Sequence, residues 1–117
     1  MNNTAATTKR NATKNKLTEV TSALSAAMAA PFTPARASGC GRAYVCISSS
    51  DRALVNAVKT ACKNLGLIFT PNGYGVGRNA IYIGYDNADG RALARSKAVS
   101  DVLNAHGIPA YDDAASD

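Results

Sequence analysis

The residue types that most often do chemistry are few in this chain, and their spacing does not suit catalysis. His106 is the only histidine, and no serine, cysteine or carboxylate stands where spacing would make it the partner of this ring. Asp86 and Asp89 could pair for acid–base chemistry, but they follow a strand-like run, where we expect them to cap a helix. We therefore expect a binding protein and not an enzyme.

The three cysteines, Cys40, Cys46 and Cys62, have no C-x-x-C spacing, and one histidine is too few to complete a zinc site with them. Cys46 and Cys62 fall in apolar patterns and are expected to be buried thiols in a reducing compartment. We predict no metal and no other cofactor. No apolar run reaches the length of a membrane span, and residues 20–30 make a poor signal sequence, so we expect a cytoplasmic protein.

Two segments have the composition of anion-binding loops. Gly73, Gly75 and Gly77 alternate in one loop, but a strand follows them instead of the helix that a phosphate cradle requires. Three serines, residues 48–50, stand at a predicted helix start, where capping explains them. We interpret the first segment as a hairpin loop and the second as a cap. Together they would form the pocket if the protein bound a small molecule.

An alternation of strands and helices positions these residues. Strands are predicted over residues 43–47, 67–70, 78–85 and 108–111, and Pro109 makes the last an edge strand. Two helices lie between them, and the inner face of the second is predicted to hold Leu93, Ala94, Ala98, Val102 and Leu103. Two β-α-β units in tandem predict an α+β domain over residues 43–111. It would be a ferredoxin-like βαββαβ antiparallel sheet with both helices on one face.

The ends of the chain differ from this domain in composition. Residues 1–15 are predicted to be a disordered basic arm, residues 16–30 an amphipathic helix, residues 31–42 a linker and residues 112–117 an acidic tail. The chain carries a net charge of +5. Much of the positive charge lies in the N-terminal third, where Glu19 is the only acidic residue. Such an arm is suited to contact a polyanion.

Strand alternation predicts that Tyr44 and Tyr82 stand on neighbouring central strands, on the face opposite the helices. Single-stranded nucleic acid is bound on four-stranded sheets by stacking bases on such rings. Residues 78–85 resemble in part the longer signature of the RNA-recognition motif. Arg78, Tyr82, Ile83 and Tyr85 match that signature, whereas residues 79–81 do not. The resemblance implies nucleic-acid binding on this face.

Our first hypothesis is a small nucleic-acid-binding protein. Tyr44 and Tyr82 would stack on bases, and the phosphate contacts would come from Lys9, Arg10, Lys14, Lys16 and Arg78. The basic residues on the outward faces of the two helices lie on the other side of the sheet, so phosphate contacts through the helices or the arm alone are an alternative route.

The second hypothesis is a protein–protein interaction module, such as a dimeric regulator, an inhibitor or an assembly factor. The helix over residues 16–30 has one narrow apolar stripe: Leu17, Val20, Leu24 and Met28. This stripe must pack on its own domain, on a second copy of the chain or on another protein.

Overall fold

The structure is a computed structural model that describes residues 4–34, 40–73, 75–87 and 89–116, with only the backbone described for residues 4–13, 40 and 116. The helices and strands follow the order α1 (Thr4–Met28), β1 (Cys40–Ile47), α2 (Arg52–Leu65), β2 (Phe69–Thr70), β3 (Ala80–Asn87), α3 (Arg91–Ala105) and β4 (Ala110–Ser116). The strands form one antiparallel sheet in the order β2-β3-β1-β4. The α+β class, the central positions of β1 and β3, and the edge position of β4 are confirmed.

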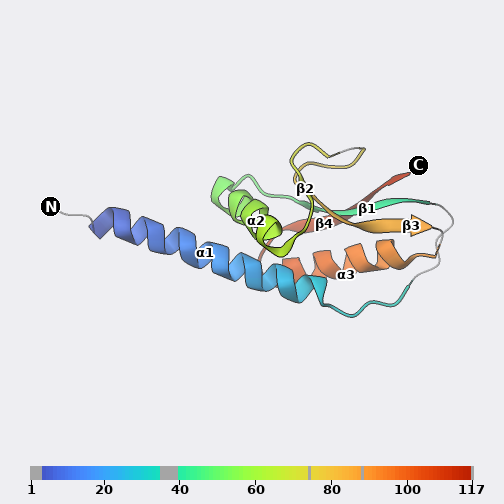
Figure 1. Cartoon of the computed structure of the whole chain (residues 1–117), viewed down its shortest axis with the longest axis horizontal. Coiled ribbons are helices and arrows are strands. Elements are labelled where there is room, and N and C mark those ends of the chain that lie inside the picture. The colour runs from blue at the N-terminus through green and yellow to red at the C-terminus, as the bar shows by residue number, and fades with distance from the viewer. Residues whose placement is uncertain (1–3, 35–39, 74, 88, 117) are drawn as a thin grey trace.

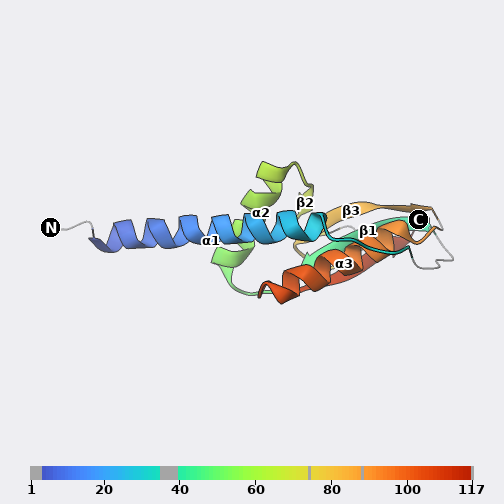
Figure 2. The same ribbon diagram turned by 90° about the horizontal axis from the view of Figure 1, so that it is seen from below.

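All three helices lie on one side of the sheet. α1 crosses α2, and its C-terminal half lies alongside α3 (Figures 1 and 2). Val45 and Ile47 of β1 and Ile81 and Ile83 of β3 point into this core, as strand alternation predicts. Burial of this apolar surface is the main contribution to the stability of the fold.

The apolar stripe of α1 completes the core. Val20 and Leu24 are only 4% and 1% exposed, and Leu17 and Met28 are partly buried against the same cluster. At the end of the helix, the guanidinium of Arg95 donates a hydrogen bond to the carbonyl of Met28 at 3.2 Å. The stripe therefore packs against α2 and α3 of its own chain.

The N-terminal part of α1 differs from the prediction. Residues 4–15, which were expected to be disordered, continue the helix, whereas residues 1–3 lie outside the described part of the chain. Neither glycine nor proline occurs between Thr4 and Met28, and extending an established helix is far easier than starting one. The packed half of α1 supplies that start. In both views the N-terminal half projects beyond the sheet and the other helices (Figures 1 and 2).

Capping residues fix the two ends of α2. The serines at residues 48–50 were predicted to stand at a helix start, but α2 begins at Arg52 with Asp51 as its cap. The Asp51 carboxylate accepts hydrogen bonds from the amides of Ala53 and Leu54 at 3.0 and 3.3 Å. α2 ends at Leu65, and Gly66 caps it in a left-handed conformation.

The start of α3 is held by Asp86 at the end of β3, which is only 2% exposed. Its carboxylate accepts hydrogen bonds from the amides of Asp89, Gly90 and Leu93 at 3.1, 2.8 and 3.3 Å. The prediction of a cap at this place is confirmed, and the cap joins β3 to α3.

The inner face of α3 differs from the prediction. Its buried side chains are mostly small: Ala92, Ser96, Val99, Ser100 and Leu103. The Ser96 and Ser100 hydroxyls each donate to a carbonyl one turn earlier at 2.9 Å, so their burial leaves no hydroxyl unsatisfied. Leu93, which was expected inside, is 36% exposed. Small side chains allow α3 to approach the sheet closely, which a pattern of large apolar residues does not reveal.

The two ends of the sheet also differ from the prediction. β1 begins at Cys40, inside the expected linker, and β4 continues to Ser116 through the expected acidic tail. The two strands pair from Gly41 with Ser116 to Ile47 with Ala110, so the longer β1 provides backbone partners for the C-terminal residues. Residues 35–39 and 117 lie outside the described part of the chain.

Candidate functional site

The loop between β2 and β3 covers the face of the sheet opposite the helices. We call the described residues of this loop, 71–73 and 75–79, the glycine strap. The amide of Gly77 donates a hydrogen bond to the Asp113 carboxylate on β4 at 3.1 Å. Val76 packs on a small buried cluster that contains Tyr44, Cys46 and Ala80. Because the strap reaches from β3 to the opposite edge strand, the predicted binding face is covered.

The glycines of the strap are required by packing. Gly73 has a φ of +50°, and a Cβ at this position would collide with the carbonyl of Gly77. A Cβ at position 77 would collide with the hydroxyl of Tyr111 and lie 3.3 Å from Cys46 Sγ. The alternating glycines thus allow close packing on the sheet, and no anion is needed to explain them.

Tyr44 and Tyr82 are neighbours, as predicted, but they are not an open stacking surface. They lie directly opposite each other in the β1–β3 register, with ring centroids 5.5 Å apart and an angle of 69° between the rings. Tyr44 is only 4% exposed, and Tyr82 is partly buried. The expectation that Tyr44 faces solvent is wrong, because the strap and the edge of the Tyr82 ring cover it.

Cys46 belongs to the same covered cluster. It is fully buried beneath the strap, and burial raises the pKa of its thiol, against the effect of a hydrogen bond with Tyr111. Cys62, in the core on the helix side, is also fully buried, and burial raises the pKa of its thiol to about 12. Both are free thiols, as predicted, and neither has the ionised character of a reactive cysteine.

A β-bulge changes which side chains of β3 reach each face. The register passes from Ala43 opposite Gly84 to Tyr44 opposite Tyr82, so Ile83 is an extra residue. Ile83 lies in the helix-side core, and a Cβ at Gly84 would lie 3.6 Å from Ala92 of α3. Two successive residues therefore face the helices, and simple alternation fails beyond Ile83.

The predicted basic residues do not gather around the tyrosines. Lys14 is exposed on α1, and Lys16 forms an ion pair with Asp51 at 3.4 Å. Lys9 and Arg10 lie on the projecting half of α1, with side chains outside the described part of the structure. Arg78 is exposed in the strap. The structure thus separates the seven predicted residues between two sides of the sheet.

A second set of cations lies on the outward surface of α2. Its exposed stripe consists of Arg52, Asn56, Lys59 and Lys63, spaced along one face of the helix. In the part of the chain that the structure describes, the ion pairs are Lys16 with Asp51 and Lys97 with Asp101, so the three cations of this stripe have no acidic partner there. The helix side is therefore the more basic side of the domain.

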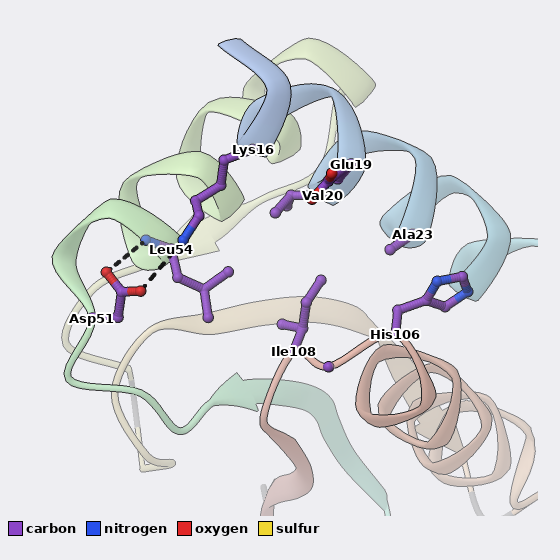
Figure 3. A pocket seen from close by; sticks show the side chains of 9 residues that line it. Lys16, Glu19, Val20, Ala23, Asp51, Leu54, His106 and Ile108 are labelled. Atoms are coloured by element: carbon purple, nitrogen blue, oxygen red, sulfur yellow. Dashed lines mark hydrogen bonds and ion pairs between the residues drawn. The ribbon is translucent and has the colours of Figure 1, made fainter. Parts of the chain in front are cut away.

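A pocket of about 420 Å³ lies where α1 passes the start of α2 and the end of α3 (Figure 3). We call it the His106 pocket, and its lining residues are Lys16, Glu19, Val20, Ala23, Asp51, Leu54, His106, Gly107 and Ile108. The side chains of Leu54 and Ile108 point into the hollow, and the Lys16–Asp51 pair closes one side (Figure 3). The amide of Leu54 and then Lys16 lower the pKa of Asp51, although desolvation acts in the opposite direction.

Sequence reasoning missed this pocket because its lining comes from three distant segments. The one available signal was that Asp51 and His106 stand at helix ends, where loops often contribute to sites. In the predicted small-molecule pocket, the glycine loop packs instead on the face of the sheet opposite the helices, through Val76 and Gly77.

No protein-family model matches the chain, and comparisons with curated proteins and with solved structures also find no match. Within the described ranges, no three metal-ligating side chains gather at one place. None of the helices in those ranges has the length and apolar character that crossing a membrane requires.

Proposed function

We propose that the protein binds nucleic acid through phosphate contacts on its helix side. The projecting half of α1 would make the main contacts, with Lys9, Arg10 and Lys14. The observation that carries this proposal is the projection of this half beyond the rest of the fold, together with the absence of any acidic residue before Glu19 (Figure 1). Lys16 is left out, because it is already paired with Asp51.

The shape of α1 supports this proposal. Its 25 residues give a helix about 37 Å long at 1.5 Å per residue, and only the C-terminal half has the apolar stripe that packs on the domain. The N-terminal half projects beyond the sheet and the other helices, so its basic residues can reach a partner (Figure 1). Cations on such a helix can follow a phosphate backbone without reading base sequence.

The two sides of the sheet differ in charge: exposed cations lie on the helix side, and a carboxylate lies on the strap side. The outward stripe of α2, with Arg52, Lys59 and Lys63, lies on the same side as α1. On the strap side, the carboxylate of Asp113 lies on the edge strand β4 beneath the strap, where it would repel phosphate. This difference favours the helix side and leaves the tyrosines out of the contact.

We also propose that the fold is ferredoxin-like, with an added N-terminal helix. The antiparallel order β2-β3-β1-β4, with α2 between β1 and β2 and α3 between β3 and β4, supports a ferredoxin-like arrangement with an added N-terminal helix. We do not extend the proposal to a homodimer through the α1 stripe, because Val20 and Leu24 are buried in the core of their own chain.

The test is fluorescence anisotropy with a labelled duplex and a labelled single strand at low salt. The arm variant is Lys9→Gln, Arg10→Gln, Lys14→Gln. The matched control, Arg78→Gln, Arg91→Gln, Lys97→Gln, removes the same charge from exposed positions elsewhere. We expect the arm variant to bind at least about tenfold more weakly and the control to stay within about threefold of the natural chain. Equal losses in both variants, or no salt-sensitive binding by the natural chain, would contradict the proposal.

A further inference from the structure

The charged side chains that line the His106 pocket have a net negative charge, and this pocket has no role in the proposed binding of nucleic acid. Of its three formally charged side chains, Lys16 and Asp51 form an ion pair with each other. Glu19 is exposed at the rim and has no ion-pair partner in the described part of the chain. After the Lys16–Asp51 pair is subtracted, one carboxylate remains.

The end of α3 adds to this surplus. The helix ends at Ala105, with His106 as its C-terminal cap, and both His106 and Gly107 line the pocket. The C-terminal end of a helix carries the equivalent of about half a negative charge from its aligned peptide dipoles. In α3 this charge is partly offset, because the amides of His106, Gly107 and Ile108 donate hydrogen bonds to carbonyls of the last turn. A positively charged group at the rim would therefore meet Glu19 and this helix end together.

The floor of the pocket has a different chemistry. Val20, Ala23 and Ile108 are 4%, 3% and 4% exposed, and Leu54 is partly buried beside them. The side chains of Leu54 and Ile108 provide hydrocarbon surface that points into the hollow (Figure 3). A volume of about 420 Å³ lies within the range of small-molecule clefts.

We propose that the His106 pocket binds a small organic cation, a protonated amine with a compact hydrocarbon body. The ammonium group lies between Glu19 and the C-terminal end of α3, and the hydrocarbon part packs on Val20, Leu54 and Ile108. An inorganic cation would leave this apolar floor unused, and a carboxylate ligand would be repelled by Glu19.

Protonated amines reach a protein either as free molecules or as lysine side chains of another protein. Cyclohexylamine stands for the first source and N-acetyl-lysine methylamide for the second. Cyclohexanol, which has nearly the same shape as cyclohexylamine and no charge, is the control for hydrocarbon binding alone.

The experiment is an NMR titration of the ¹⁵N-labelled full chain with each of the three probes at millimolar concentrations. We expect an amine probe to shift the amide signals of Ala23, Leu54 and Gly107 in a saturable way. Cyclohexanol should bind at least about tenfold more weakly. A stronger response to cyclohexylamine identifies the source as a free amine, and a stronger response to the lysine derivative identifies it as a side chain.

Two variants test the role of charge. Glu19→Gln should weaken amine binding at least about tenfold, whereas Asp101→Asn, which removes an exposed carboxylate paired with Lys97 on α3, should leave it unchanged. Glu19 is exposed, so a spectrum of natural dispersion is expected and confirms folding. Equal binding of cyclohexanol and amines, equal effects of the two variants, or no saturable shifts in the pocket would overturn the proposal. The nucleic-acid proposal stands apart, because Glu19→Gln is not expected to weaken oligonucleotide binding.

Discussion

The two faces of the sheet are closed in different ways. On the helix side, three helices bury an apolar core that includes Leu24, Val45 and Ile81, and their outward surfaces carry the cations. On the other side, a short glycine strap covers Tyr44 and Cys46 and is fastened by a hydrogen bond to Asp113. The first cover has a basic outward surface. The second closes a face that aromatic residues would otherwise open to ligands.

This difference bears on the predicted stacking of bases on Tyr44 and Tyr82. Tyrosines on central strands offer a stacking surface only if nothing lies over them. Here the strap and the Tyr44–Tyr82 contact cover that surface, while the N-terminal half of α1, on the helix side, projects beyond the rest of the fold (Figure 1).

The largest effect is expected from Leu24→Ala in the helix-side core. Leu24 is 1% exposed between α1 and the rest of the domain, so its truncation should lower the free energy of unfolding by about 2 to 5 kcal/mol. Urea unfolding followed by circular dichroism measures the loss. Ser25→Ala, at the exposed neighbouring position, should stay within about 0.5 kcal/mol of the natural chain. A loss for Leu24→Ala as small as that of the control would show that α1 is not docked.

A smaller loss of folding stability is expected from Gly77→Ala, which adds a methyl group beneath the strap. The new Cβ would collide with the Tyr111 hydroxyl, so the free energy of unfolding should fall by about 1 to 3 kcal/mol. Cys46 beneath the strap should also react faster with a thiol reagent. In a Tyr111→Leu background, Gly77→Ala should lower the free energy of unfolding by less, because the colliding hydroxyl is absent. If the two losses of free energy are equal, the strap does not pack on Tyr111.

A third, pH-dependent effect is expected at Asp86, which joins β3 to α3. Burial acts to raise the pKa of this carboxyl, but the hydrogen bonds from Gly90, Asp89 and Leu93 outweigh it and lower the pKa below its usual value. A lowered pKa in the folded state adds stability above the unfolded value of about 4, and this stability is lost as the pH falls through the folded value.

Thermal unfolding at about pH 7 and about pH 3 measures the contribution of Asp86. Asp86→Asn should lower the melting temperature at the higher pH, and the difference from the natural chain should shrink at the lower pH. Asp101→Asn, on the exposed side of α3, is the control. A melting-temperature difference that is the same at both pH values would contradict the role of the ionised carboxylate.

The smallest effect on stability is expected from Tyr82→Leu, which removes the edge-to-face contact with Tyr44 but keeps an apolar side chain. The loss should be about 0.5 to 1.5 kcal/mol, the usual contribution of an aromatic pair. Oligonucleotide affinity should not change. A clear loss of single-strand affinity in this variant would instead support stacking on the strap side.

The helix-side core was predictable from the sequence because it depends on local patterns. Val45, Ile47 and Ile81 lie on the helix-side face that strand alternation requires, and Asp86 marked a helix start through chemistry that acts over a few residues. Such local patterns predict the structure because each helix or strand buries the face on which its apolar residues recur.

The features that escaped prediction depend on contacts between distant residues. The strap lies over the sheet because Gly77 meets Tyr111 and Asp113, more than thirty residues later in the chain. Ser96 is buried because its hydroxyl is satisfied within the helix, so its polarity did not mark an outward face. The His106 pocket combines three segments, none of which has a motif of its own.

The most direct test of the central claim is the salt dependence of oligonucleotide binding by the natural chain and the arm variant. The slope of log affinity against log salt concentration counts the phosphates that a protein neutralises, at about 0.9 per phosphate for duplex DNA. If Lys9, Arg10 and Lys14 each contact a phosphate, the slope of the arm variant should be shallower by about 2.7. Identical slopes for the two proteins would show that the projecting half of α1 does not contact nucleic acid.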